Sequence, residues 1–224
     1  MVLSAKIFKL SEYIPIDIIY DKISGYRVKE DYEGIEVQEY FEDINVIGGM
    51  VKGFYIYDEV RVFNVGGELR NIPIRREVPI IFIEYRGGEY LIIFEKKPRA
   101  NKIAIKISEI LFIRGDMIIE AFITHETLKS LHESAPEATK VIYFDNVDLP
   151  NINKLALYGD SLADTSLYNE YLKHGLIWYV VFQHRDTGYV VGITRNAIIA
   201  MFTNITLDDF QDFILRHVLP LISS

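Results

Sequence analysis

Basic side chains gather at the start of one predicted helix of this 224-residue chain. A helix N-terminus presents unpaired backbone N–H groups and the positive end of the helix dipole, so lysines and arginines there could bind an anion or a nucleic-acid backbone. Arg75 and Arg76 occur in a nearby segment. The alternative is a helix face that is simply solvated. The candidate anion- or nucleic-acid-binding residues are Lys96, Lys97, Arg99, Lys102 and Lys106.

A serine motif offers a second kind of chemistry. The Gly-Asp-Ser-Leu segment at 159–162 resembles the GDSL block of serine esterases, which implies that Ser161 is a nucleophile beside an oxyanion site. That family carries an Asp-x-x-His near its C-terminus, and this sequence has none. Asp212 and His217 lie five residues apart on one predicted helix, where their side chains point to different faces. A triad needs a base within reach of the serine, so we expect an ordinary turn here and assign no catalytic residue.

The histidines do not show the spacing of metal ligands. His125 and His132 lie two turns apart on one predicted helix, or about 10 Å, whereas zinc ligands lie about 2 Å from a common ion. We expect both on a solvated face. His174, His184 and His217 have no acidic or histidine partner at ligand spacing in the sequence. The sequence therefore predicts no metal site, and no segment is predicted to bind a cofactor.

Composition restricts the class of protein. Half of the residues are hydrophobic, the net charge is −8 and there is no cysteine, which excludes a disordered chain, a disulfide scaffold and a thiol nucleophile. No apolar run reaches the ~18 residues that a membrane-spanning helix needs, and no secretion signal is visible, so we expect a cytoplasmic protein without membrane contact. Scarce glutamine beside abundant Glu, Lys and Tyr is typical of hot habitats, so we expect a thermophilic archaeon as the source.

The sequence contains two matches between its halves. Residues 40–46 align with residues 143–149, and residues 82–94 align with residues 181–193, in the same order and at nearly the same separation. The alternative is that both matches are unrelated amphipathic hairpins. Repeated blocks of this kind predict a duplicated structural unit.

The first half predicts a strand, a helix, an antiparallel meander and a closing helix. Three Gly-Gly pairs suit two-residue hairpin turns, at 48–49, 66–67 and 87–88. Gly25 suits a left-handed cap at the end of the first helix. Pro73 and Pro79 indicate an edge, a bulge or a break within the meander. The expected elements are the strand 5–10, the helix 16–24, the meander 34–95 and the helix 98–111.

The second half predicts a similar series. Thr124 and Thr206 are expected to cap two helices, Pro136 to end the first of these, and Gly175 to end a short helix in between. The closing helix is expected to run without interruption to Leu221. The expected strands are 117–124, 140–148, 154–158, 176–184, 188–194 and 197–203.

These elements predict an α+β fold of two tandem pseudo-repeats, 1–112 and 113–224, that form one cooperative unit. Each repeat has the order strand, helix, antiparallel meander, helix, with the helices on one face of the sheet. This order resembles the saddle of TATA-binding-protein-like folds. The resemblance lies in element order, so it implies the fold and carries no functional residue.

The absence of a convincing nucleophile, metal site or cofactor site favours a binding or scaffold protein over an enzyme. Its expected partner is another protein or a second copy of the chain, because residues 113–224 carry most of the excess negative charge. The first alternative is a nucleic-acid-binding protein that uses the basic cluster at 96–106. The second alternative is a GDSL-like hydrolase that uses Ser161.

Overall fold

The computed structural model describes residues 2–134 and 138–223, which form an α+β fold with a large antiparallel sheet and five α-helices in that part of the chain. The predicted α+β class with an antiparallel sheet is therefore confirmed. Contacts divide the chain into two compact units: a first unit, Phe8–Ile119, and a second unit, Met1–Ile7 with Glu120–Ser224. Pro136, the predicted stop of a helix, lies outside the described residues.

The first unit is an antiparallel meander with two helices. The strand order is β2-β3-β4-β5-β6, so neighbours in sequence are neighbours in the sheet. The helices are α1 (Ile16–Ser24) and α2 (Lys97–Phe112). The strands are β2 (Arg27–Tyr32), β3 (Ile35–Ile47), β4 (Met50–Val65), β5 (Glu68–Tyr85) and β6 (Gly88–Ile93).

Tight turns join these strands. The pairs at 48–49 and 66–67 form the predicted hairpin turns, with positive φ at all four glycines. In the third hairpin the turn is shifted by one residue: Arg86 and Gly87 have positive φ, and Gly88 begins β6. The first helix ends differently from the prediction, because Gly25 has φ −97° and is right-handed. The meander also begins earlier than expected, since the mostly charged and exposed β2 precedes it.

The prolines of β5 lie in an unbroken strand. Pro73 is opposite Val60 and Pro79 is opposite Phe54 in a continuous ladder between β4 and β5. On its other side β5 pairs with β6 only from Ile80 onward. The sequence predicts an edge, a bulge or a break at these prolines, and the structure shows an edge. Proline has no N–H, and it is tolerated there because no neighbouring strand needs that donor.

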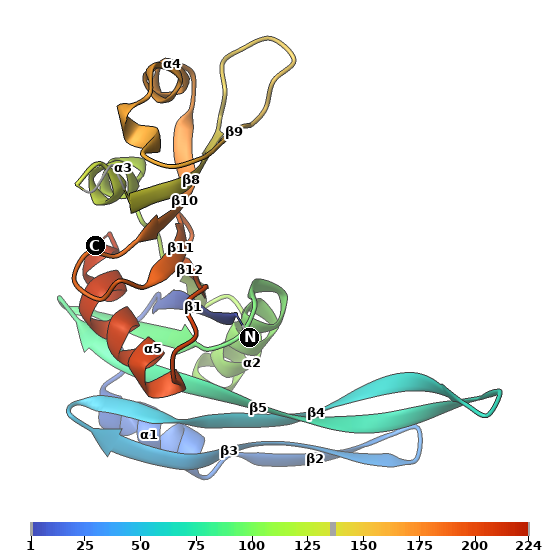
Figure 1. The fold of residues 1–224 in the computed structure, drawn as a ribbon. Helices are drawn as coiled ribbons and strands as arrows, with labels where there is room; N and C mark the ends of the chain where they lie inside the picture. The colour runs from blue at the N-terminus through green and yellow to red at the C-terminus, as the bar shows by residue number, and fades with distance from the viewer. Residues whose placement is uncertain (1, 135–137, 224) are drawn as a thin grey trace. The chain divides into compact units, whose positions relative to one another are not determined.

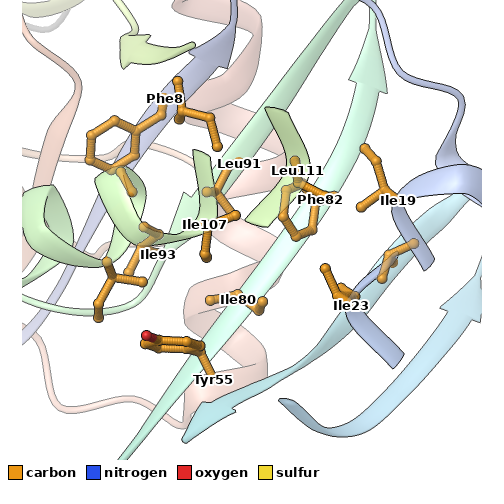
Figure 2. Packing of buried hydrophobic residues seen from close by; sticks show 14 of the residues in the cluster. Phe8, Ile19, Ile23, Tyr55, Ile80, Phe82, Leu91, Ile93, Ile107 and Leu111 are labelled. Carbon is orange, nitrogen blue, oxygen red and sulfur yellow. The ribbon is translucent and has the colours of Figure 1, made fainter. Parts of the chain in front are cut away.

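The core of the first unit lies between α2, α1 and the sheet (Figure 2). Figure 2 shows Ile107 and Leu111 of α2 beside Leu91 and Ile93 of β6. The apolar spacing of α2 places its buried side chains on one face, as predicted. These side chains are Ala100, Ile103, Ala104, Ile107 and Leu111.

The second unit has the strand order β1-β12-β11-β10-β8-β9, and β7 pairs with β1. Leu3–Lys6 of β1 form the part that pairs with β12. The strands are β1 (Leu3–Leu10), β7 (Ile118–Glu120), β8 (Thr139–Asp145), β9 (Leu155–Tyr158), β10 (Leu176–Gln183), β11 (Val190–Thr194) and β12 (Ile198–Met201). The helices are α3 (His125–Glu133), η2 (Leu162–Asp164), α4 (Ser166–His174) and α5 (Leu207–Phe213).

Both predicted threonine caps are confirmed: Thr124 accepts from the backbone N–H of Thr127, and Thr206 accepts from that of Asp209. The closing helix, however, is not continuous. After α5 the chain forms a π-helical segment, η3 (Ile214–Val218), and a 3-10 turn, η4 (Leu219–Leu221). Pro220 explains the change, because its ring excludes the carbonyl of residue i−4 and its nitrogen cannot donate.

Candidate functional site

The ends of β4 and β5 extend beyond the neighbouring strands as a two-stranded arm. The ladder between β3 and β4 ends where Glu39 faces Tyr57, whereas β4 and β5 remain paired as far as Val65 and Glu68. We call residues 58–76 the arm; it is the long teal hairpin of Figure 1. A ribbon of two strands has no third strand or helix to bury its side chains, so its surface is available for contact.

Asp58 marks the base of the arm. Its side chain accepts a hydrogen bond from the backbone N–H of Gln38 at 3.0 Å and two from the Arg75 guanidinium at 3.1 and 3.2 Å. The carboxylate thus takes the place of a backbone acceptor where β3 separates from β4. A second contact, from Asn71 Nδ2 to Glu33 Oε2 at 2.8 Å, joins the arm to the β2–β3 turn.

The arm exposes apolar side chains on both faces. Directly opposite residues share a face, so Val62 lies on one face with Asn71, and Phe63 lies on the other with Arg70. Leu69 is 75% exposed and Val62 is 62% exposed. Single exposed apolar residues are ordinary on a protein surface, but a cluster within one hairpin marks a contact site. The exposed apolar residues of the arm are Val62, Phe63, Val65, Leu69 and Ile72.

The two edges of the arm differ. Pro73 interrupts the donors of the β5 edge, and prolines of this kind prevent strands from pairing edge to edge. The β4 edge from Glu59 to Val65 contains no proline, and within residues 2–134 and 138–223 no strand pairs with it. Three of its residues, Val60, Val62 and Val65, are β-branched and Phe63 is aromatic, which suits a paired strand. The free β4 edge can therefore accept another strand.

The charges of the arm are largely paired with one another. Glu59 forms ion pairs with Arg61 at 2.8 Å and Arg76 at 3.1 Å, and Glu68 pairs with Arg70 at 3.0 Å. Burial alone would raise the pKa of Glu59, but the contacts with Arg61 and Arg76 hold this pKa below its ordinary value. Four arginines and three carboxylates make the arm slightly positive in a chain whose net charge is −8. They are Arg61, Arg70, Arg75, Arg76, Asp58, Glu59 and Glu68.

The predicted basic cluster lies at and beyond the start of α2, where it borders a pocket of about 340 Å³. Arg99, Lys102 and Lys106 line this pocket, whereas Lys96 and Lys97 do not. Arg99 pairs with Glu95 at 3.2 Å and Lys106 with Glu39 at 3.7 Å. The remaining lining residues are Glu39, Tyr55, Tyr57, Asp58, Glu59 and Ile103. Three carboxylates among three basic side chains reduce the attraction for a polyanion, so the charge balance does not favour phosphate binding here.

The prediction that His132 lies on a solvated face is wrong. His132 is fully buried, and its Nε2 lies 2.9 Å from the hydroxyl of Tyr168, which donates to Glu133 at 2.8 Å. The tyrosine has one proton to give, so Nε2 of His132 is the donor in this pair. Burial lowers the pKa of His132 to about 4. His125 is also engaged, since its Nδ1 accepts the backbone N–H of Ile177 at 2.8 Å.

The other three histidines, for which sequence spacing indicates no ligand partner, each lie beside an acidic or histidine side chain in the structure. The rings of His184 and His217 have centroids 4.4 Å apart, and one ligand atom from each lies within 4.8 Å of a carboxylate oxygen of Asp186. His174 contacts Asp148 at 2.8 Å and Glu170 at 3.4 Å. His184 with His217, and His174 with Asp148, are contacts between residues far apart in the sequence, which spacing within a short motif cannot show.

Ser161, the candidate nucleophile, lies in a turn before a 3-10 helix. Ser161 has φ 53° and precedes η2, and Asp160 pairs with Lys140 at 3.2 Å. Within the described ranges 2–134 and 138–223, the Ser161 hydroxyl makes no hydrogen bond to a histidine. His217, the candidate base, contacts Phe213 and His184 instead.

No protein-family model and no curated protein matches this chain. In residues 2–134 and 138–223, the helices are too short or too polar to cross a bilayer. The candidate site therefore depends on the geometry of the arm itself.

Proposed function

We propose that this chain is a non-enzymatic binding or scaffold protein that acts through protein–protein contacts, and that the arm is its contact site. One observation carries the proposal: the β4 edge from Glu59 to Val65 is unpaired and bears exposed apolar side chains on both faces. An added strand would satisfy the backbone groups of the edge and cover Val62 and Phe63 at the same time. Binding by strand addition uses these two contributions together.

The occupant that we propose is a second copy of the chain, paired β4 to β4 in the antiparallel sense about a two-fold axis. Such an interface uses the same surface on both copies, which is the commonest symmetry of protein assemblies. Two copies with a net charge of −8 each repel one another, and the arm is a region where excess negative charge is absent. Contact through the arm therefore adds no repulsion between regions of excess negative charge.

The same proposal includes the finer features of the predicted fold, two pseudo-repeats in a saddle-like arrangement. Asp43 and Asn146, which occupy equivalent positions in the aligned blocks 40–46 and 143–149, both have left-handed backbone conformations, with φ 52° and 49°. A left-handed conformation is uncommon for residues other than glycine, so its occurrence at matched positions supports a duplication.

Sedimentation velocity over a range of protein concentrations tests the association. We expect dimers for the natural sequence and an at least tenfold higher dissociation constant for a variant with Val62→Lys and Leu69→Lys. The matched control is Ile113→Lys, because Ile113 is 91% exposed and lies outside the arm. A monomeric natural protein, or equal weakening by the control, would contradict the proposal and would leave a different protein as the partner.

A further inference from the structure

A second site lies in the second unit, apart from the arm. His184 follows the last residue of β10, Asp186 is in the turn to β11, and His217 is in η3. These three residues each offer one ligand atom, and the three atoms lie within 4.8 Å of one another. From this geometry we infer that His184, Asp186 and His217 form a binding site for a divalent transition-metal ion such as Zn²⁺.

The donor set suits such an ion. Imidazole nitrogen and carboxylate oxygen bind Zn²⁺ at about 2.0–2.2 Å, so two ligands of one ion are at most about 4 Å apart. The present separations exceed that limit by less than about 1 Å. Asp186 is exposed and belongs to a turn, so a change of its side-chain conformation can close this difference. Hard cations such as Mg²⁺ prefer oxygen ligands and are not favoured by two histidines.

The turn that carries two of the ligands is held in place by its own hydrogen bonds. The backbone N–H of His184 donates to Tyr189 at 2.8 Å, and the N–H of Gly188 donates back to the carbonyl of His184 at 2.8 Å. The hydroxyl of Thr187 lies 3.2 Å from Nδ1 of His184. Partners of this kind orient a ligating imidazole and leave Nε2 as the nitrogen available to the ion. The ligand set is thus partly arranged before any ion binds.

The third ligand occupies an unusual backbone. His217 lies in the π-helical segment, and short π segments within helices occur frequently at functional sites. The centroid of the Phe213 ring lies 5.2 Å from the imidazole centroids of both His184 and His217, so Phe213 packs against both histidines.

A pocket of about 180 Å³ is lined by His217, although His184 and Asp186 do not line it, so water can approach the group from the side of His217. Its charged residues are Asp209, Asp212 and Arg216, of which Arg216 pairs with Asp212 at 3.2 Å. Three protein ligands leave one position of a tetrahedral ion open, and water from this pocket can fill it. The remaining lining residues are Thr187, Tyr189 and Phe213.

Titration with Co²⁺ and Zn²⁺ tests the site in the full chain without a histidine tag. The absence of cysteine removes thiolate absorption, so the visible bands of bound Co²⁺ report histidine and carboxylate coordination directly. We expect one equivalent of Co²⁺ to bind, Zn²⁺ to displace it, and Mg²⁺ at the same concentration to leave the bands unchanged.

Variants assign the bands to these residues. Asp186→Asn changes an exposed turn residue and should weaken Co²⁺ binding at least tenfold, and His217→Gln should abolish the bands. His174→Gln is the matched control, because His174 contacts two carboxylates on the surface but is not part of the three-residue group. Absence of one-equivalent binding by the natural sequence, or binding that Asp186→Asn leaves unchanged, would overturn the inference.

Discussion

The Oδ2 atom of Asp58 lies 3.0 Å from the backbone nitrogen of Gln38, at the point where β3 leaves β4. The same carboxylate is held by Arg75, and its side chain is only 7% exposed. Asp58 therefore supplies an acceptor to the partly buried N–H of Gln38 where the β3–β4 ladder ends, and it marks where the two-stranded arm begins. The proposed contact site depends on this branch point.

Replacing Asp58 should destabilise the base of the arm. Asp58→Ala leaves the N–H of Gln38 and the guanidinium of Arg75 without their acceptor, which we expect to lower the free energy of unfolding by about 1–3 kcal/mol. Asp58→Asn keeps an oxygen acceptor, so it should lower the free energy of unfolding by less than Asp58→Ala does. Urea denaturation measures the difference. Asp160→Ala, which removes a surface ion pair with Lys140, is the control; an equal loss in both alanine variants would contradict this role.

Truncation of the α2 face should affect the whole first unit. Ile107 is fully buried in the cluster that α2 forms with the sheet (Figure 2). We expect Ile107→Ala to lower the free energy of unfolding by about 2–5 kcal/mol, because the cavity adds to the lost burial. The exposed Ile105 on the same helix gives the matched control, Ile105→Ala. Similar unfolding midpoints for the two variants would refute this assignment of the core face.

Acid should destabilise the protein through His132. Its pKa is lowered by burial to about 4 in the folded state, against 6.5 for an ordinary histidine, so between these values the unfolded state binds more protons. The contribution of His132 to the free energy of unfolding is therefore constant above pH 6.5. This contribution is lost as the pH decreases from 6.5 to 4. The slope from this residue is at most about 1.4 kcal/mol per pH unit.

The comparison variant is His132→Gln, measured by denaturant unfolding at several pH values. We expect the natural protein to lose more stability than the variant between pH 6.5 and 4, even if the variant is less stable throughout. Glu133, Lys129 and His125 also act on this imidazole and remain in both proteins. Parallel stability curves would show that His132 does not carry this pH dependence.

Much of the local structure follows from the sequence. The apolar spacing of α2, the caps Thr124 and Thr206, and the glycine turns at 48–49 and 66–67 are all confirmed, because each depends on residues close together in the chain. The sequence does not predict the exposed strand β2, because a charged strand without a buried face shows no alternation of apolar and polar residues.

The sites depend on longer-range geometry. The free β4 edge arises because β3 separates from β4 at Asp58, which no pattern within β4 indicates. His184 and His217 meet through folding of separate elements, and the burial of His132 depends on Tyr168 from another helix. Sequence spacing identifies ligands only when they lie on one element, so these arrangements required the tertiary structure.

Disulfide formation between copies tests the central claim most directly, because the natural chain has no cysteine. Single cysteines are introduced on β4 at Val60, Val62 or Asn64, and on β5 at Leu69 as the control. Antiparallel pairing of Glu59–Val65 with the same segment of a second copy places Val62 opposite itself at the two-fold axis, within the ~4.4–6.8 Å between Cα atoms that a disulfide allows. In each copy Leu69 lies one strand further from the axis, so two Leu69 residues are about 10 Å further apart than two opposed β4 residues. We predict rapid covalent dimers from a β4 cysteine and few from Leu69→Cys under mild oxidation; equal or absent cross-linking at all four positions would contradict the account.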